Sequence, residues 1–156
     1  MLMAIYHLHC KVFSRSNGQT AIAAAAYRSG TKLEDHELGT VSDYTKKKGI
    51  AFSEIALPSN APKEYADREV LWNAVQEVEK SKDAQLCREF EIALPKELSL
   101  DEQIDLVRTF AKSLVSEGMI ADYSIHDKND GNPHVHSLPT MRRMDDNGKW
   151  MAKLRK

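Results

Sequence analysis

The chain has 156 residues, of which 42% are hydrophobic and 29% are charged, and its formal net charge at pH 7 is −1. These values predict one soluble globular domain, and no apolar run approaches the roughly 18 residues that a membrane span needs. No signal peptide or disulfide scaffold is indicated, so we expect a cytoplasmic protein in which Cys10 and Cys87 are buried free thiols.

The charge is distributed unevenly along the chain. Residues 1–50 carry seven basic and four acidic groups, residues 106–156 carry nine and six, and residues 51–105 carry six and thirteen. Two interpretations stay open. The two ends build a basic face that holds a polyanion, or the split reflects solvated helix surfaces alone.

Hydrophobic spacing predicts an α+β fold, with one mainly antiparallel sheet of about five strands and helices packed on one face of it. Thr20 and Gly30 bound an alanine-rich first helix, and Ser99 with Glu102 forms a capping box for the last. Residues 31–48 are polar and predicted to be irregular. We expect strands over 3–13, 49–58, 84–95, 120–128 and 133–144, and helices over 20–30, 62–78 and 99–117.

The run HDKNDGNPHVHS, residues 126–137, contains three of the six histidines. Its centre is a strong turn signal, so we expect a hairpin. His134 and His136 project from one face of a strand, and the hairpin brings His126 onto the neighbouring strand about 5 Å away. Three imidazoles on one rigid face suit a divalent cation. The alternative is a group of surface histidines without a ligand. His7 and His9 form a second pair, for which we expect no ligand role or an outer-shell role.

Tyr27 lies near the end of the alanine-rich helix. It is either an ordinary anchor of the helix end or a nucleophile whose anion is favoured by Arg28 and a nearby metal ion. Glu89 and Glu91 share one face of a strand. They are solvent-exposed, or one of them orients a metal-bound histidine or acts as a general base for Tyr27.

The runs TAIAAAAYRSG, DYTKKKGI, REFEIALP and DGNPHVH resemble, in that order, the N-terminal domain of the MobA/MobL (MobQ-type) conjugative relaxases, which are HUH endonucleases. The resemblance covers about residues 3–143. It implies a metal-assisted enzyme that binds single-stranded or hairpin DNA at a plasmid origin of transfer. A tyrosine attacks the scissile phosphate, which leaves a 5′-phosphotyrosine bond and a free 3′-OH, and the reaction reverses after transfer. By position, the resemblance assigns the nucleophile to Tyr27, one divalent ion (Mn, Mg, Zn or Ni) to His126, His134 and His136, and the acidic partner to Glu89 or Glu91.

Basic residues are the candidates for holding the DNA, since phosphates must be neutralised along the strand. Tyr44 is a candidate for stacking on a base. A solvated loop is the alternative for the three lysines. The basic candidates are Arg28, Lys46, Lys47, Lys48, Arg142 and Arg143.

The sequence departs from the family pattern at Pro139, which predicts a kinked strand or an edge strand after the histidine pair. We expect residues 1–156 to be a relaxase domain from a longer protein, truncated at its C-terminal side. We expect a monomer, with relaxosome accessory proteins and a coupling protein as further partners. Two other functions are open: a phosphodiesterase that uses a metal-bound water, and a nucleic-acid-binding module in which the metal only staples the hairpin.

Overall fold

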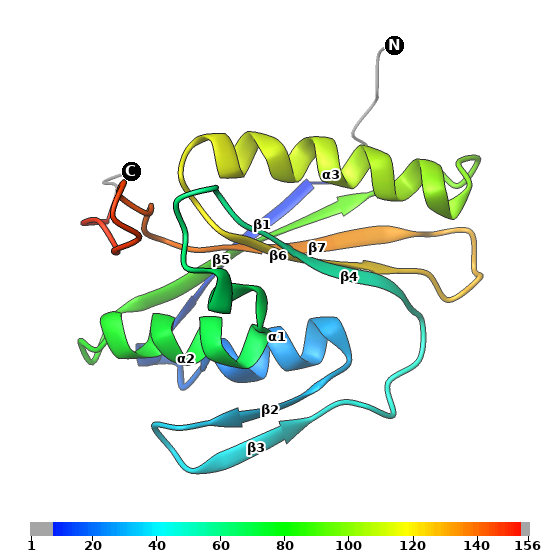
Figure 1. Cartoon of the computed structure of the whole chain (residues 1–156). Helices are drawn as coiled ribbons and strands as arrows, with labels where there is room; N and C mark the ends of the chain where they lie inside the picture. Colours follow the sequence, from blue (N-terminus) through cyan, green and yellow to red (C-terminus); the bar gives the residue numbers. More distant parts are fainter. Residues whose placement is uncertain (1–7, 154–156) are drawn as a thin grey trace.

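The protein is described from a computed structural model, which places residues 8–153 (Figure 1). The predicted α+β fold with a five-stranded antiparallel sheet is confirmed. In chain order the elements are β1 (Leu8–Ser14), a 3-10 turn (Arg15–Asn17), α1 (Ala21–Ser29), β2 (Lys32–Asp35), β3 (Thr40–Asp43), β4 (Ile50–Ala56), a second 3-10 turn (Lys63–Ala66), α2 (Arg68–Val78), β5 (Gln85–Ala93), α3 (Leu100–Ser116), β6 (Ala121–His126) and β7 (His134–Pro139).

The main sheet has the strand order β1-β5-β7-β6-β4, and every pair in it is antiparallel. The helices cover both of its faces and not one, with α3 on one side and α1 and α2 on the other (Figure 1). Ile125 and Val135 pack in the cluster under α3, whereas Cys87 and Leu138 pack in the cluster with α1 and α2. The inner strands therefore carry apolar residues on both faces, and each face needs a cover.

The β7 strand lies in the centre of the sheet, so Pro139 does not mark an edge. Pro139 is the last residue of the strand, and the ladder to β5 stops at the pair of Ser137 with Phe90. A single bridge between Thr140 and Cys87 follows. A proline without an N–H group is tolerated here because it sits where the ladder is interrupted.

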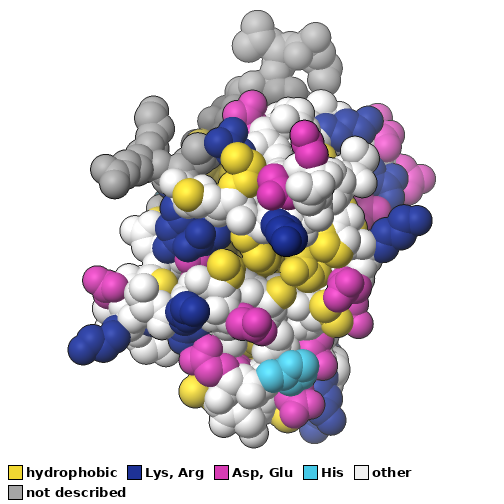
Figure 2. Space-filling model, turned by 60° about the vertical axis from the view of Figure 1, so that its left-hand side comes forward, with side chains coloured by type: hydrophobic (Ala, Val, Ile, Leu, Met, Phe, Trp, Pro, Cys, Tyr) yellow, Lys and Arg dark blue, Asp and Glu magenta, His cyan; other side chains and the backbone are white. Residues whose placement is uncertain are grey.

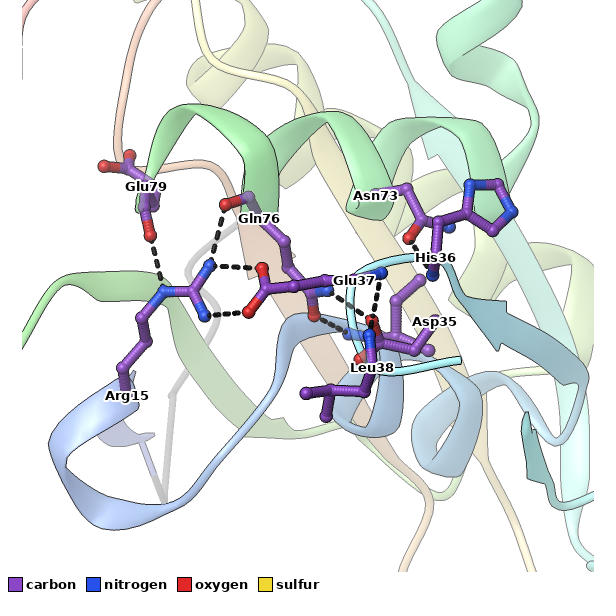
Figure 3. Close-up of polar contacts among 9 residues, drawn as sticks. Arg15, Asp35, His36, Glu37, Leu38, Asn73, Gln76 and Glu79 are labelled. Carbon is purple, nitrogen blue, oxygen red and sulfur yellow. Dashed lines mark hydrogen bonds and ion pairs between the residues drawn. The ribbon is translucent and has the colours of Figure 1, made fainter. Parts of the chain in front are cut away.

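Residues 31–48 are not irregular, because they contain the antiparallel hairpin of β2 and β3. Both strands are short and mostly solvated, so the sequence gives little apolar alternation by which to recognise them. Polar contacts fix the hairpin to α2 and to the 3-10 turn that follows β1 (Figure 3). Arg15 Nη1 lies 2.7 Å from the Glu37 carboxylate, and Gln76 Nε2 donates to Asp35 Oδ1 at 3.1 Å. Gln76 and Asp35 are both buried, so this contact is shielded from solvent.

The helix boundaries follow the capping residues. In α1 the Thr20 side chain accepts the Ala23 N–H, and Gly30 ends the helix at a φ of +67°. The capping box of α3 is also present. The second helix begins later than predicted, because a 3-10 turn follows Pro62 and Asp67 caps α2.

Cys87 is buried as predicted, but Cys10 is exposed on edge strand β1. Leu8 and Val12, on the same side of β1, are also 52% and 38% exposed. The prediction for Cys10 is wrong because α3 packs mainly over β4 and β6 at the other edge of the sheet. Between residues 8 and 153, no helix has the length and apolar character needed to cross a membrane.

Candidate functional site

The β6–β7 hairpin brings three histidines together, as the sequence predicts. His126 lies directly opposite His134 in the register, and His136 lies two residues further along β7. The ring centroids are 5.5 Å apart for His126 and His134, 4.3 Å for His126 and His136, and 5.0 Å for His134 and His136. The turn that joins the strands holds Asn129 at a φ of +59° and Gly131 at +78°, conformations that asparagine and glycine adopt most readily.

Each imidazole uses one ring nitrogen to bind the surrounding protein. His136 Nδ1 lies 2.8 Å from Glu89 Oε2, and His134 Nδ1 lies 2.9 Å from the Asn132 carbonyl oxygen. His126 Nε2 lies 2.7 Å from the Arg28 carbonyl oxygen. When these nitrogens donate, the second nitrogen of each ring is free to accept a metal ion.

The three histidines fit a divalent metal ion. One ligand atom from each of them can be chosen so that all lie within 4.8 Å of one another. Burial lowers the pKa of His126 to about 4, so its ring is neutral at pH 7, which is the form that binds metal. Three protein ligands would leave coordination positions for a substrate oxygen.

Glu89, and not Glu91, makes the contacts expected of the acidic partner. Its side chain is 2% exposed and accepts hydrogen bonds from His136 and from the Arg28 guanidinium. Burial by itself would raise the pKa of Glu89, but these two donors lower it to about 2. Glu91 lies on the same face beside His136 and is only partly buried. Glu89 therefore links His136 to Arg28 in the last turn of α1.

Tyr27 lies in the last turn of α1, and the carbonyl group of the next residue, Arg28, contacts His126. Tyr27 is 46% exposed, so much of the residue is accessible to solvent. The Tyr44 ring contacts the Tyr27 ring edge-on, with the two ring centroids 5.1 Å apart, and Lys47 Nζ lies 3.4 Å from the Tyr27 ring centroid. Burial, together with the charges of Arg28 and Lys128, lowers the pKa of Lys47. This gathering of positive charge around Tyr27 suits an anionic substrate.

The MobA/MobL family model matches residues 19–156. This chain belongs to the MobA/MobL family. It is 41% identical over 155 residues to the conjugal transfer protein TraA of Rhizobium radiobacter, covering 92% of this chain and 14% of TraA. It is 40% identical over 161 residues to the mobilization protein MobL of Acidithiobacillus ferridurans, covering 96% of this chain and 41% of MobL. The family prediction is confirmed, and the chain spans less than half the length of these two curated relatives.

A solved structure has a closely similar fold. It comes from work on the molecular basis of vancomycin resistance transfer in Staphylococcus aureus. The TM-score is 0.91 at 42% sequence identity, and the match covers 97% of this chain and 78% of that chain.

The basic candidates for DNA contact in this MobA/MobL chain lie in different surroundings. Lys46 and Lys48 are exposed, whereas Lys47 lies on the Tyr27 ring. Arg142 binds the buried carboxylate of Glu79 at the C-terminal end of α2, with its Nε 2.9 Å from Oε2. Arg143 packs beside Gly118, and its Nε is buried without a hydrogen-bond partner among the described residues. On the face drawn in Figure 2, acidic and basic side chains are interspersed around a hydrophobic area.

Of the second histidine pair, His7 lies outside the described residues. His9 lies on β1 and lines, with Glu91 and His134, a hollow of about 150 Å³. This places His9 next to the metal-site candidates without making it one of the three clustered ligands.

Two features of this MobA/MobL site escape sequence reasoning. One is the use of the Arg28 and Asn132 carbonyl groups as acceptors for the histidine rings, since backbone groups carry no residue signal. The other is the buried ion pair between Arg28 and Glu89. Their opposite charges are visible in the sequence, but no spacing rule relates a helix end to a strand 61 residues away.

Proposed function

We propose that this domain is a DNA relaxase that nicks single-stranded DNA at an origin of transfer and rejoins it during conjugative mobilisation. One observation carries the proposal: the candidate nucleophile and the candidate metal site share their supporting contacts. The carbonyl group of Arg28, the residue after Tyr27, binds His126, and the Arg28 side chain shares Glu89 with His136. The names of the relatives, which refer to conjugal transfer and mobilization, support the same role.

In the proposed reaction the Tyr27 hydroxyl oxygen bonds to the scissile phosphorus and its proton leaves to solvent. The bond from phosphorus to the 3′ oxygen breaks, and that oxygen takes up a proton, so the strand ends in a 3′-OH and a 5′-phosphotyrosine. A divalent ion on the three histidines would withdraw charge from the phosphate oxygens. The exchange of one phosphate ester for another is nearly balanced, which permits rejoining.

Glu89 has a positioning role in this scheme. A general base works best when its pKa lies near the working pH, and a carboxylate whose pKa is about 2 is a weak base at pH 7. Its hydrogen bond to His136 fixes the ring and increases its basicity toward a metal ion. Glu91 is less buried and remains the second candidate for this role.

The DNA contacts belong to the same proposal. Lys46 and Lys48 are exposed on either side of Lys47 in the sequence and would neutralise phosphates. Tyr44 is half-buried against Tyr27, so only its free edge would meet a base. Arg142 is held by Glu79, and for this reason we place it outside the set of first contacts.

The test uses single-stranded oligonucleotides that tile the DNA flanking the coding sequence, each with a 3′ fluorophore. The chain is incubated with each of them and Mn²⁺, and the products are separated on a denaturing gel. We expect a protein-linked band that requires the metal and is absent in Tyr27→Phe. Cleavage that survives in Tyr27→Phe would indicate a metal-bound water as the nucleophile. Binding without any adduct would indicate a binding module.

A further inference from the structure

Lys47 contacts Tyr27 at two points. Its Nζ lies 3.4 Å from the centroid of the Tyr27 ring and donates to the Tyr27 carbonyl oxygen at 2.8 Å. An ammonium group over the face of a phenol ring is attracted by the negative charge of that face. The second contact satisfies one of the carbonyl groups that a helix end leaves without a partner. Lys47 is thus bound to both the side chain and the backbone of the residue proposed as nucleophile.

The two neighbouring lysines are placed differently. Lys46 and Lys48 are exposed, whereas Lys47 is partly buried. Three consecutive lysines suggest three equivalent phosphate contacts, and the structure separates the middle one from the others. Lys47 is therefore less available than Lys46 and Lys48 to bind a phosphate, although all three carry the same charge.

The segment that carries Lys47 is held in place from two sides. Asp43 Oδ1 accepts from the Thr45 N–H at 3.0 Å and from the Thr45 hydroxyl group at 2.6 Å, and the Lys47 N–H donates to the Tyr44 carbonyl at 3.0 Å. The Tyr44 N–H donates to the Thr31 carbonyl at 3.1 Å, which joins the turn to the chain two residues after the end of α1. Because the turn already places the ammonium group on the ring, little conformational entropy is lost at this position when DNA binds.

We propose that Lys47 is a positioning residue for Tyr27, which fixes the orientation of the phenol for attack on the phosphate. The inference rests on the proposed function and goes beyond it, because it gives Lys47 a role in the cleavage step and not in DNA affinity. A reacting oxygen that is displaced by about 1 Å reduces the rate by roughly 10²-fold. Removal of the ammonium group leaves the ring with Tyr44 on one edge and the Arg28 guanidinium carbon 5.6 Å from its centroid, and it removes the nearer cation at 3.4 Å.

The first experiment separates the cleavage step from binding. Lys47→Met keeps a flexible apolar chain and removes the charge, and Lys47→Arg restores a cation that can lie on the ring. For each variant we measure the single-turnover cleavage rate at saturating DNA and the Kd from fluorescence anisotropy in Ca²⁺, with the oligonucleotide that the wild-type chain cuts.

We expect Lys47→Met to lower the cleavage rate by about 10- to 100-fold and to change the Kd less than threefold. Lys47→Arg is expected to recover at least a tenth of the wild-type rate. Lys46→Met and Lys48→Met are expected to act on the Kd and on its salt dependence. Lys112→Met removes one charge from the exposed side of α3, on the other face of the sheet, and serves as the charge control.

The second experiment needs no DNA. In ¹H–¹³C NMR spectra, the ring current of Tyr27 should move the Lys47 Cε protons upfield relative to those of Lys46 and Lys48. Tyr27→Leu should remove this shift, and Tyr27→Phe should keep it because the ring remains.

The outcomes are distinct. A wild-type cleavage rate in Lys47→Met, or a large loss of affinity with the rate unchanged, would overturn this inference while the relaxase proposal stands. A wild-type chain that forms no adduct with any oligonucleotide would overturn both. An absent upfield shift would also overturn the inference, because the contact with the ring would not exist in solution.

Discussion

Glu89→Gln is the substitution that tests how the site is built. Glutamine keeps the shape of the side chain and one acceptor oxygen but removes the negative charge. Glu89 is 2% exposed and its two donors, Arg28 and His136, are 11% and 13% exposed at their side chains. The change therefore leaves the Arg28 cation facing a neutral amide in a nearly dry environment.

The expected magnitude follows from these contacts. Hydrogen bonds to charged groups contribute about 1.5–3 kcal/mol each, and the amide retains part of that interaction. We expect the metal-free protein to lose about 2 kcal/mol of unfolding free energy. A metal-bound histidine that loses its carboxylate partner binds metal about 10- to 100-fold more weakly. That factor corresponds to about 1.4–2.8 kcal/mol of metal-binding free energy.

Two assays check the two effects. Urea unfolding followed by circular dichroism in EDTA gives the stability of the metal-free chain, and isothermal titration with Mn²⁺ gives the affinity. Glu91→Gln is the matched comparison, because Glu91 lies on the same strand face two residues away and is more exposed. We expect both effects to be smaller in Glu91→Gln.

A weaker Mn²⁺ affinity in Glu91→Gln than in Glu89→Gln would refute the assignment of Glu89 as the partner of His136. Unchanged affinity in both variants would refute the idea that a carboxylate supports the histidine site at all. A loss of stability in Glu89→Gln without a loss of affinity would show that the Arg28 ion pair matters only to the fold.

Three further predictions concern the metal, a backbone position and pH. His136→Ala should lower Mn²⁺ affinity by at least tenfold in the same titration, with little change in the circular dichroism spectrum, since the ring is a proposed ligand and not part of the apolar core. Gly30→Ala should cost about 1 kcal/mol or more of unfolding free energy, because the residue has a φ of +67° and an added Cβ would lie 3.0 Å from Ile50. Gly18→Ala is the control for backbone strain alone, since Gly18 has a φ of +72° and no atom within 4 Å of an added Cβ. Equal losses in the two variants would contradict the contribution of the clash with Ile50. The Arg108 hydrogen bond holds the pKa of Glu54 below its usual 4.5, so Glu54 stabilises the fold above that pH, and this contribution disappears as the pH falls through the lower folded pKa. The difference in unfolding free energy between wild type and Glu54→Gln, below about 1 kcal/mol for this partly exposed pair, should therefore close in urea titrations at low pH. A difference that widens at low pH would exclude the reasoning.

Local patterns by themselves determined much of this protein. Strand alternation places His134 and His136 on one face, and the turn residues between Asp127 and Pro133 make the hairpin that brings His126 opposite them. Thr20 and Gly30 set the limits of α1 through their own hydrogen bonds and conformation. These features depend on residues that are close in sequence, and so they can be read without the fold.

Only the tertiary structure decided which distant groups meet. Glu89 and Glu91 look alike in sequence, and Arg28 at the end of α1 is what separates them by pairing with Glu89. The three lysines also look alike until the β2–β3 hairpin, fixed through Arg15 and Glu37, leads the chain to the Tyr27 ring. The physical reason is the same in both cases: burial and charge pairing depend on segments that are far apart along the chain. No local propensity encodes which of several identical side chains will face a partner on a distant segment.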